Sequence, residues 1–196
     1  LKIEALVLKY SDETRKSFGK KKYAEEIDFL VSHEKRNRFI ANLALDQKGN
    51  SLVLYNLVKK HGEPLFKQIR DRAKNRKVFF VSGSVNAEER EKIREITEQE
   101  KNAIIVASVG TFSTGINIKS LNNIIFASPT KSQIRVLQSI GRGLRKSNNG
   151  QGTVVYDIAD DLSWKSRKNY TLNHAISRVK IYDKENFKYN IHSINI

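Results

Sequence analysis

The chain has 196 residues, of which 39% are hydrophobic and 29% charged, which is enough for one globular core and excludes a disordered tail. It contains no cysteine, which excludes disulfides and thiolate chemistry, and its four histidines are too scattered to suggest a zinc cluster, so we expect no metal site. Thirty-six Lys and Arg against 21 Asp and Glu give a net charge of +15, which indicates a polyanionic partner, with solubility alone as the alternative.

The first segment, Leu1 to Tyr10, is predicted to be a leading strand, followed by a solvated basic loop at Lys20 to Lys22. No apolar run is long enough to span a bilayer, and the N-terminus lacks the pattern of a signal peptide, so we expect a cytoplasmic protein with no membrane partner. The chain begins at Leu1 and contains no methionine, which suggests a piece of a longer protein. We therefore predict that residues 1–31 join the chain to a preceding domain.

The central segment, residues 32–160, alternates between strand and helix patterns. Ser32 is predicted to cap a helix that runs through Ala44, and Asn86 with Glu89 forms a capping pair for a later helix. Five nearly continuous apolar runs predict buried strands: Leu52–Tyr55, Val78–Val81, Ala103–Ala107, Ile124–Ala127 and Val154–Ile158. Helical patterns lie between most of them: Lys59–Ala73, Ala87–Glu100 and Lys131–Leu144. This order predicts an α/β fold, an open parallel sheet with helices on both faces.

Residues 161–196 are predicted to form a C-terminal extension. A basic helix is expected from Trp164 to Lys184, and the pair Asp160–Asp161 before it is interpreted as a helix cap. A short strand from Phe187 to Ile194 is expected to pair at an edge of the sheet. The positive charge of this helix, including Arg167 and Lys168, predicts contact with nucleic acid.

Small polar residues follow the predicted strands. In an open parallel sheet, ligands bind beyond the carboxyl ends of the strands, where backbone N–H groups and short side chains suit phosphate oxygens. Ordinary turn chemistry favours the same residue types, but their joint occurrence on one edge favours a site. The residues at these positions are Asn56, Ser82, Gly83, Ser108, Gly110, Thr111, Ser128, Thr130 and Asp157.

The stretch "LQSIGRGLRK" places Gln138, Arg142 and Arg145 together on the flank of an apolar helical stripe. A guanidinium offers a fixed fork of donors for phosphate oxygens, and the γ-phosphoryl group of ATP develops charge during transfer that such forks stabilise. Gly141 removes side-chain bulk so that a nucleotide or another domain can approach closely. The spacing therefore predicts a contribution to ATP hydrolysis.

The segments "SLVLYN", "VFFVSGSVNAEERE", "AIIVASVGTFSTGINI" and "LQSIGRGLRK" resemble motifs IV, IVa, V and VI of the second RecA-like domain of superfamily 2 helicases. The amino-acid sequence, including the C-terminal "DKENFKYNIHSINI", is similar to that of phage UvsW-type DNA helicases, which act on branched DNA and recombination intermediates. The resemblance covers most of the chain, from about Ile27 to Asp160.

The resemblance implies a role for each matching residue. Arg142 and Arg145 correspond to arginine fingers, Gln138 to a nucleotide sensor, and Gly115, Asn117 and Gly141 to contacts with ATP. Many relatives have aspartate at the position of Asn117, which leaves its ribose contact in question. Contacts with the nucleic-acid backbone are implied for Asn56, Gly83, Ser84, Ser108, Gly110 and Thr111.

No P-loop motif and no acidic Walker B strand end occur in the chain. ATP and Mg²⁺ are therefore expected to bind mainly to an N-terminal RecA-like domain of the same protein, and this chain alone is expected to be inactive. The predicted function is the C-terminal motor half of an ATP-dependent DNA helicase on branched or single-stranded DNA. Two alternatives remain open, a non-catalytic nucleic-acid-binding module and the motor part of a nuclease or restriction subunit.

Overall fold

The computed structural model describes residues 1–83, 86–113, 120–129 and 152–196. Within these residues, seven parallel strands form one sheet in the order β3-β4-β2-β5-β6-β1-β7. Its strands are β1 (Lys2–Lys9), β2 (Ser51–Tyr55), β3 (Val78–Val81), β4 (Ile104–Ser108), β5 (Asn123–Phe126), β6 (Val154–Asp161) and β7 (Lys188–Asn195). The predicted parallel sheet is confirmed.

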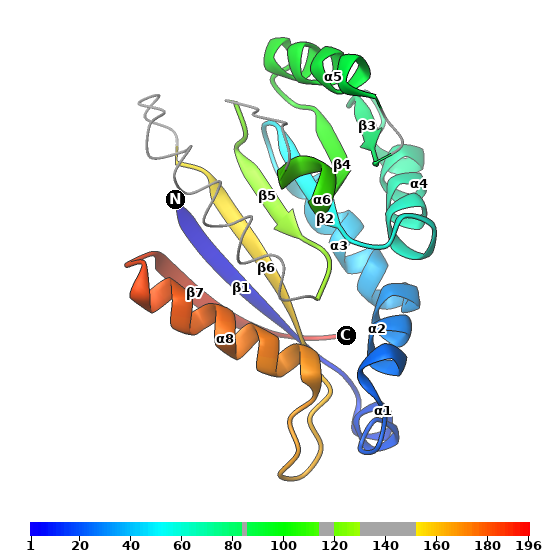
Figure 1. The fold of residues 1–196 in the computed structure, drawn as a ribbon, viewed down its shortest axis with the longest axis vertical. Helices are drawn as coiled ribbons and strands as arrows, with labels where there is room; N and C mark the ends of the chain where they lie inside the picture. Colours follow the sequence, from blue (N-terminus) through cyan, green and yellow to red (C-terminus); the bar gives the residue numbers. More distant parts are fainter. Residues whose placement is uncertain (84–85, 114–119, 130–151) are drawn as a thin grey trace.

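Helices cover both faces of this sheet, and in Figure 1 α8 crosses one face while α3 passes behind the other. The described helices are α1 (Asp12–Ser17), α2 (Tyr23–Ser32), α3 (Glu34–Asp46), the π-helix η1 (Val58–Gly62), α4 (Glu63–Arg72), α5 (Ala87–Gln99), α6 (Val109–Ser113) and α8 (Tyr170–Lys184). The predicted helix over Lys131–Leu144 lies outside the described residues.

Two hydrophobic cores form because successive side chains of a strand point to opposite faces. On the α3 face, Val53 and Tyr55 of β2 pack with buried residues of α2, α3 and α4. On the α8 face, Leu52 and Leu54 belong to a cluster that includes Tyr182 of α8 and Ile93 of α5. All five residues of β2 are buried, which explains why its sequence is a continuous apolar run.

Several helix ends differ from the prediction. The Oδ1 atom of Asn86 accepts from the N–H of Glu89 at 2.7 Å, which confirms the predicted cap of α5. Ser32 instead ends a separate helix, α2, which was not predicted, and His33 caps α3 by accepting from the N–H of Arg36 at 3.2 Å. The Ser32 prediction was wrong because α2 uses this residue for its own last turn, where its hydroxyl donates to Asp28 O at 2.6 Å.

The C-terminal helix begins at Tyr170, six residues later than predicted, because Trp164 and Arg167 form a short antiparallel bridge. Asp160 and Asp161 are the last residues of β6 and do not cap this helix. Its first N–H groups are satisfied from another helix, since Glu26 of α2 accepts from the N–H of Tyr170 at 3.1 Å and from that of Thr171 at 2.8 Å.

The two ends of the chain are built into the same sheet. The leading strand β1 is confirmed, but it lies inside the sheet between β6 and β7, while β7 forms the predicted edge. Each face of β6 carries one buried ion pair. Asp160 binds Arg36 of α3 at 2.8 and 3.0 Å, and Asp157 binds Arg178 of α8 at 2.9 Å. These contacts attach helices from distant parts of the sequence to one strand.

Candidate nucleic-acid interface

The three adjacent strands β3, β4 and β2 bring several predicted contact residues to one edge of the sheet. Ser82 and Gly83 follow β3, Ser108 ends β4, and Asn56 follows β2. The register pairs Val81 with Ala107 and Tyr55 with Ser108, so these residues lie at the same level of the carboxyl edge. Two strand spacings span only about 10 Å. This part of the rim is brought together as the sequence predicts.

Tyr55 fixes the relative position of two of these strands. Its hydroxyl donates to Val81 O at 3.0 Å, which connects β2 to β3 across the intervening β4, and its ring stacks on Phe80 at 5.6 Å. Burial, assisted by the charge of Glu63, raises the pKa of Tyr55, so its hydroxyl stays protonated and continues to donate. The ring also fills the space beside Gly62, where an added Cβ would lie 2.5 Å from it.

Ser108 and Thr111 are joined by two hydrogen bonds. The Ser108 hydroxyl donates to Thr111 Oγ1 at 2.6 Å and accepts from the Thr111 N–H at 3.2 Å, which caps the short helix α6. Both residues are buried. By contrast, Gly83 and Gly110 are exposed, and a Cβ added at either would meet no atom within 4 Å. The open surface at this edge is therefore backbone, which suits contact with a phosphate chain of any sequence.

Arg167 and Lys168 are exposed and precede α8, so they do not belong to the predicted basic helix. The guanidinium of Arg167 donates to the backbone carbonyls of Gly19 and Lys21, the latter at 3.2 Å. This side chain thereby holds the basic loop after α1 against the segment after β6. Lys168 makes no ion pair within the described part of the chain.

Asp157 is not a rim residue, because β6 continues for four residues beyond it. The carboxylate is buried, and besides Arg178 it accepts a hydrogen bond from the Tyr182 hydroxyl at 2.5 Å. Ser128 follows β5 at the expected edge but is buried as well. The predicted strand ended at Ile158, whereas β6 continues to Asp161. The sequence did not show this continuation because Asp160 and Asp161 are charged.

The remaining predicted site residues lie outside the described residues. They are Ser84, Gly115, Asn117, Thr130, Gln138, Gly141, Arg142 and Arg145. The proposed nucleotide contacts and arginine fingers therefore stay predictions.

Within the ranges that the structure describes, no group of three or more His, Asp or Glu side chains could hold a metal ion. The acidic side chains of β6 that face the cores, Asp157 and Asp160, are each bound to an arginine. These residues do not fit a magnesium site. None of the described helices is both long and apolar enough to cross a membrane.

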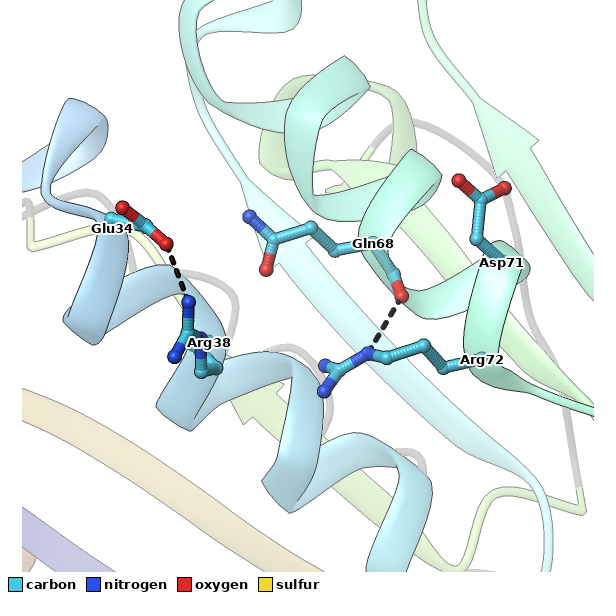
Figure 2. A pocket seen from close by; sticks show the side chains of 5 residues that line it. All are labelled: Glu34, Arg38, Gln68, Asp71 and Arg72. Carbon is cyan, nitrogen blue, oxygen red and sulfur yellow. Dashed lines mark hydrogen bonds and ion pairs between the residues drawn. The ribbon is translucent and has the colours of Figure 1, made fainter.

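A hollow of about 360 Å³ lies between α3 and α4. Figure 2 shows its lining, which is Glu34, Arg38, Gln68, Asp71 and Arg72. The charges are balanced, and three of the four are in ion pairs, Arg38 with Glu34 and Asp71 with Lys67. Arg72 donates to Asn42 Oδ1 at 2.7 Å and to Gln68 O at 3.1 Å. None of the predicted contact residues lines it, so we assign no ligand to it.

Sequence reasoning missed the buried polar residues that organise this end of the molecule. Arg36 and Arg178 lie within predicted helices and Glu26 lies in α2, which was not predicted; a charged residue in a helix is usually solvated, and only the tertiary structure shows the burial of these three. It also missed His61 in η1, which is fully buried and has no hydrogen-bond partner on either ring nitrogen among the described residues. Burial, together with the positive charge of Arg36, lowers the pKa of His61 to about 3, so the ring is neutral.

Comparison with known proteins agrees with this fold. The chain is 38% identical to the ATP-dependent DNA helicase uvsW of Enterobacteria phage T4 over its whole length. The crystal structure of T4 UvsW superimposes on 99% of the chain with a TM-score of 0.85 and 36% identity. In both comparisons the chain spans 41% of the length of that relative. The C-terminal domain of the DEAD-box protein Dbp5, 11% identical with a TM-score of 0.59 over 84% of this chain and 86% of that one, shares the fold alone.

The solved structures of similar fold are RecA-like helicase domains, which confirms the predicted fold class. The model of the helicase conserved C-terminal domain matches residues 34–147, more than half of the chain. The chain belongs to the helicase conserved C-terminal domain family.

Proposed function

We propose that this chain is the C-terminal motor domain of an ATP-dependent DNA helicase that acts on branched DNA or recombination intermediates. The observation that carries the proposal is the 38% identity to the T4 helicase along the entire chain, including both terminal segments. Those segments lie outside the region matched by the general family model, so the likeness extends beyond the common motor fold.

In this proposal the chain contributes half of an ATPase site. Arg142 and Arg145 stabilise the charge that develops on the transferred phosphoryl group, and Gln138 senses the nucleotide. Gly115, Asn117 and Gly141 lie against ATP. The P-loop and the Mg²⁺ site belong to an N-terminal RecA-like domain, because this chain contains no P-loop motif. The isolated chain therefore does not hydrolyse ATP.

The nucleic-acid grip comes from the carboxyl edge of the sheet. Exposed backbone at Gly83 and Gly110 approaches phosphates, with Asn56, Ser108 and Thr111 at the same edge, and Lys168 and Arg167 add positive charge. Ser84, the residue after Gly83 in the sequence, is proposed to contribute a further phosphate contact. Because such contacts reach the phosphate backbone and not the base edges, binding depends little on sequence. Closure against the partner domain couples hydrolysis to movement along one strand. We take residues 32–160 as the motor domain, flanked by 1–31 and 161–196, working in the cytoplasm of a phage-infected bacterium.

The proposal is tested with the full-length protein, by DNA-stimulated ATP hydrolysis and unwinding of a labelled four-way junction. Arg142→Ala and Arg145→Ala should each reduce the hydrolysis rate by roughly a thousandfold or more with a smaller effect on ATP binding. Arg38→Ala, an exposed arginine in α3, is the matched control and should hydrolyse ATP at the parent rate.

Three outcomes would contradict the proposal. A full-length protein that binds DNA without hydrolysing ATP would favour a non-catalytic module. DNA cleavage that depends on ATP would favour a nuclease or restriction subunit. Parent-like hydrolysis by both arginine variants would refute the finger assignment.

A further inference from the structure

Two segments that are more than 140 residues apart in sequence meet beyond the carboxyl ends of β1 and β6. One is the loop Gly19–Lys22 with Tyr23 of α2, and the other is the turn Trp164–Tyr170, which includes the first residue of α8. Arg167 joins them through its hydrogen bonds to the carbonyls of Gly19 and Lys21. We call the surface formed by these two segments, with α1 beside them, the basic–aromatic platform; both segments are at the lower end of Figure 1.

The platform carries a strong excess of positive charge. Residues 10–23 and 161–170 together contain eight Lys and Arg against three Asp and Glu. Five of these lysines are exposed and make no ion pair with any described residue: Lys16, Lys20, Lys22, Lys165 and Lys168. Lysines that outnumber the nearby carboxylates attract a polyanion.

Two exposed tyrosine side chains lie where the two segments of the platform meet. Tyr23 is 40% exposed and Tyr170 is 42% exposed, and they make up half of the four large hydrophobic side chains that are exposed among the described residues. Their rings contact each other edge-to-face at 5.8 Å, and Tyr23 also contacts the ring of His174 at 5.6 Å. These contacts hold the rings in place while two fifths of each side chain stays open to solvent.

The N-termini of α2 and α8 lie beside the platform, but their backbone N–H groups are not available to bind an anion. Glu25 accepts from the backbone N–H of Lys22 at 2.7 Å at the start of α2, and Glu26 accepts from the first turn of α8. Because carboxylates already satisfy these N–H groups, attraction for an anion at this surface comes from the lysines.

The platform extends the same edge of the sheet as the predicted phosphate contacts. It follows β6 and β1, whereas Ser108 and Gly110 follow β4, which is four strand spacings from β1 in the sheet. At the usual spacing the lateral separation is about 19 Å, and because β6 continues three residues past the level of Ser108, the platform lies at least about 10 Å further along the strand direction. A nucleic-acid strand along the carboxyl edge can therefore reach both.

We propose that the basic–aromatic platform binds single-stranded DNA, with bases stacked on Tyr23 and Tyr170 and phosphates held by the surrounding lysines. Stacking on aromatic rings combined with a basic surface is the general mode of sequence-tolerant single-strand binding. A duplex does not expose its base faces, so the tyrosines distinguish single strands from duplex DNA. This inference rests on the proposed function, to which it adds a second contact region for the displaced strand.

The test uses the full-length protein and three labelled probes: an oligothymidylate of about 20 nucleotides, longer than typical single-strand sites, an abasic strand of equal length, and a duplex. Tyr23→Ala/Tyr170→Ala should weaken oligothymidylate binding about tenfold or more, since each stacked base contributes measurably. The same variant should bind the abasic strand and the duplex as the parent does. Tyr23→Phe/Tyr170→Phe should retain oligothymidylate binding because the rings remain.

The lysines have a different signature. Lys20→Ala/Lys22→Ala should weaken binding of all three probes and flatten the slope of log affinity against log salt by about 1.4 units for single strands, about 0.7 for each lost contact. Lys92→Ala/Lys101→Ala removes the same charge at and just after α5, near the other end of the sheet, and should leave binding unchanged.

Parent-like oligothymidylate affinity in the double alanine variant would overturn the inference, as would an equal loss on the abasic strand. If that variant does not fold, ultraviolet cross-linking of the parent to a bromodeoxyuridine strand decides: a peptide containing Tyr23 or Tyr170 supports the platform, and cross-links only elsewhere reject it. DNA-stimulated ATP hydrolysis by the parent is measured in parallel. Without that hydrolysis the proposed function fails, whereas loss of strand binding in an ATPase-competent variant concerns the platform alone.

Discussion

Asp160→Asn should severely destabilise the protein, because it leaves the guanidinium of Arg36 charged and buried without a counter-charge. Both side chains are fully buried. Asp160 accepts from Arg36 Nε at 2.8 Å, from Arg36 Nη2 at 3.0 Å and from the Tyr10 hydroxyl at 2.8 Å. In the parent, burial disfavours the charged guanidinium, but Asp160 outweighs this effect and raises the pKa of Arg36. In the variant the guanidinium still keeps its proton, because the ordinary pKa of arginine lies far above neutral pH.

Breaking a buried ion pair by removing one partner costs about 3–5 kcal/mol. This cost is a large fraction of the total unfolding free energy of a typical protein, about 5–15 kcal/mol. For a chain of this size each kcal/mol of lost stability lowers the melting temperature by about 2–4 °C, so the variant should melt about 6–20 °C below the parent. The assay is thermal unfolding followed by circular dichroism, with urea denaturation to obtain the free energy of unfolding.

A double-variant cycle separates the orphaned charge from other effects. Arg36→Met in the Asp160→Asn background removes the charge and should recover at least half of the lost stability, since an apolar replacement of a buried pair is often neutral. Glu34→Ala, which breaks an exposed pair in the same helix, is the control and should melt close to the parent. A single variant that melts within 2 °C of the parent, a threshold of about 1 kcal/mol or less, would refute the reasoning.

Three further predictions concern the same end of the fold. His61→Leu should be near neutral at pH 7 and should flatten acid destabilisation. The pKa of His61 is about 3 in the folded protein and about 6.5 in the unfolded chain, so between these pH values the unfolded chain binds one proton more. The stability of the parent therefore falls as the pH drops from about 6.5 to about 3, by at most about 1.4 kcal/mol per pH unit. Equal slopes of unfolding free energy against pH for parent and variant, measured by urea denaturation, would contradict this. Gly62→Ala should lower the free energy of unfolding by about 1–3 kcal/mol because the added Cβ clashes with Tyr55. Gly152→Ala, where an added Cβ meets open space, is the control and should leave the free energy of unfolding in urea denaturation close to that of the parent. Glu26→Ala should expose unpaired N–H groups at the start of α8 and increase hydrogen exchange there first, whereas uniform exchange changes would argue against a local cap.

The local elements followed from the sequence where a pattern repeats within a few residues. The apolar runs predicted β2, β4 and β5 closely, because a strand buried on both faces needs apolar side chains at every position. The edge strand β3 was also predicted from its apolar run, although three of its four residues are only partly buried. The Asn86 cap is also local, since its bond spans three residues. Even so, β6 was predicted too short, because Asp160 and Asp161 beyond Ile158 are polar in sequence, and Asp160 is buried only through a partner 124 residues away.

The sequence by itself determined the fold class and the candidate nucleotide and DNA motifs, since strand periodicity and motif spacing are encoded by neighbouring residues. Only the tertiary structure decided which distant segments share an edge. It placed β1 between β6 and β7, aligned Ser82, Ser108 and Asn56 across three strands, and brought Lys20 to Lys22 against Arg167. The physical reason is that strand order and helix docking depend on contacts between residues far apart in the chain, which no short stretch of sequence contains.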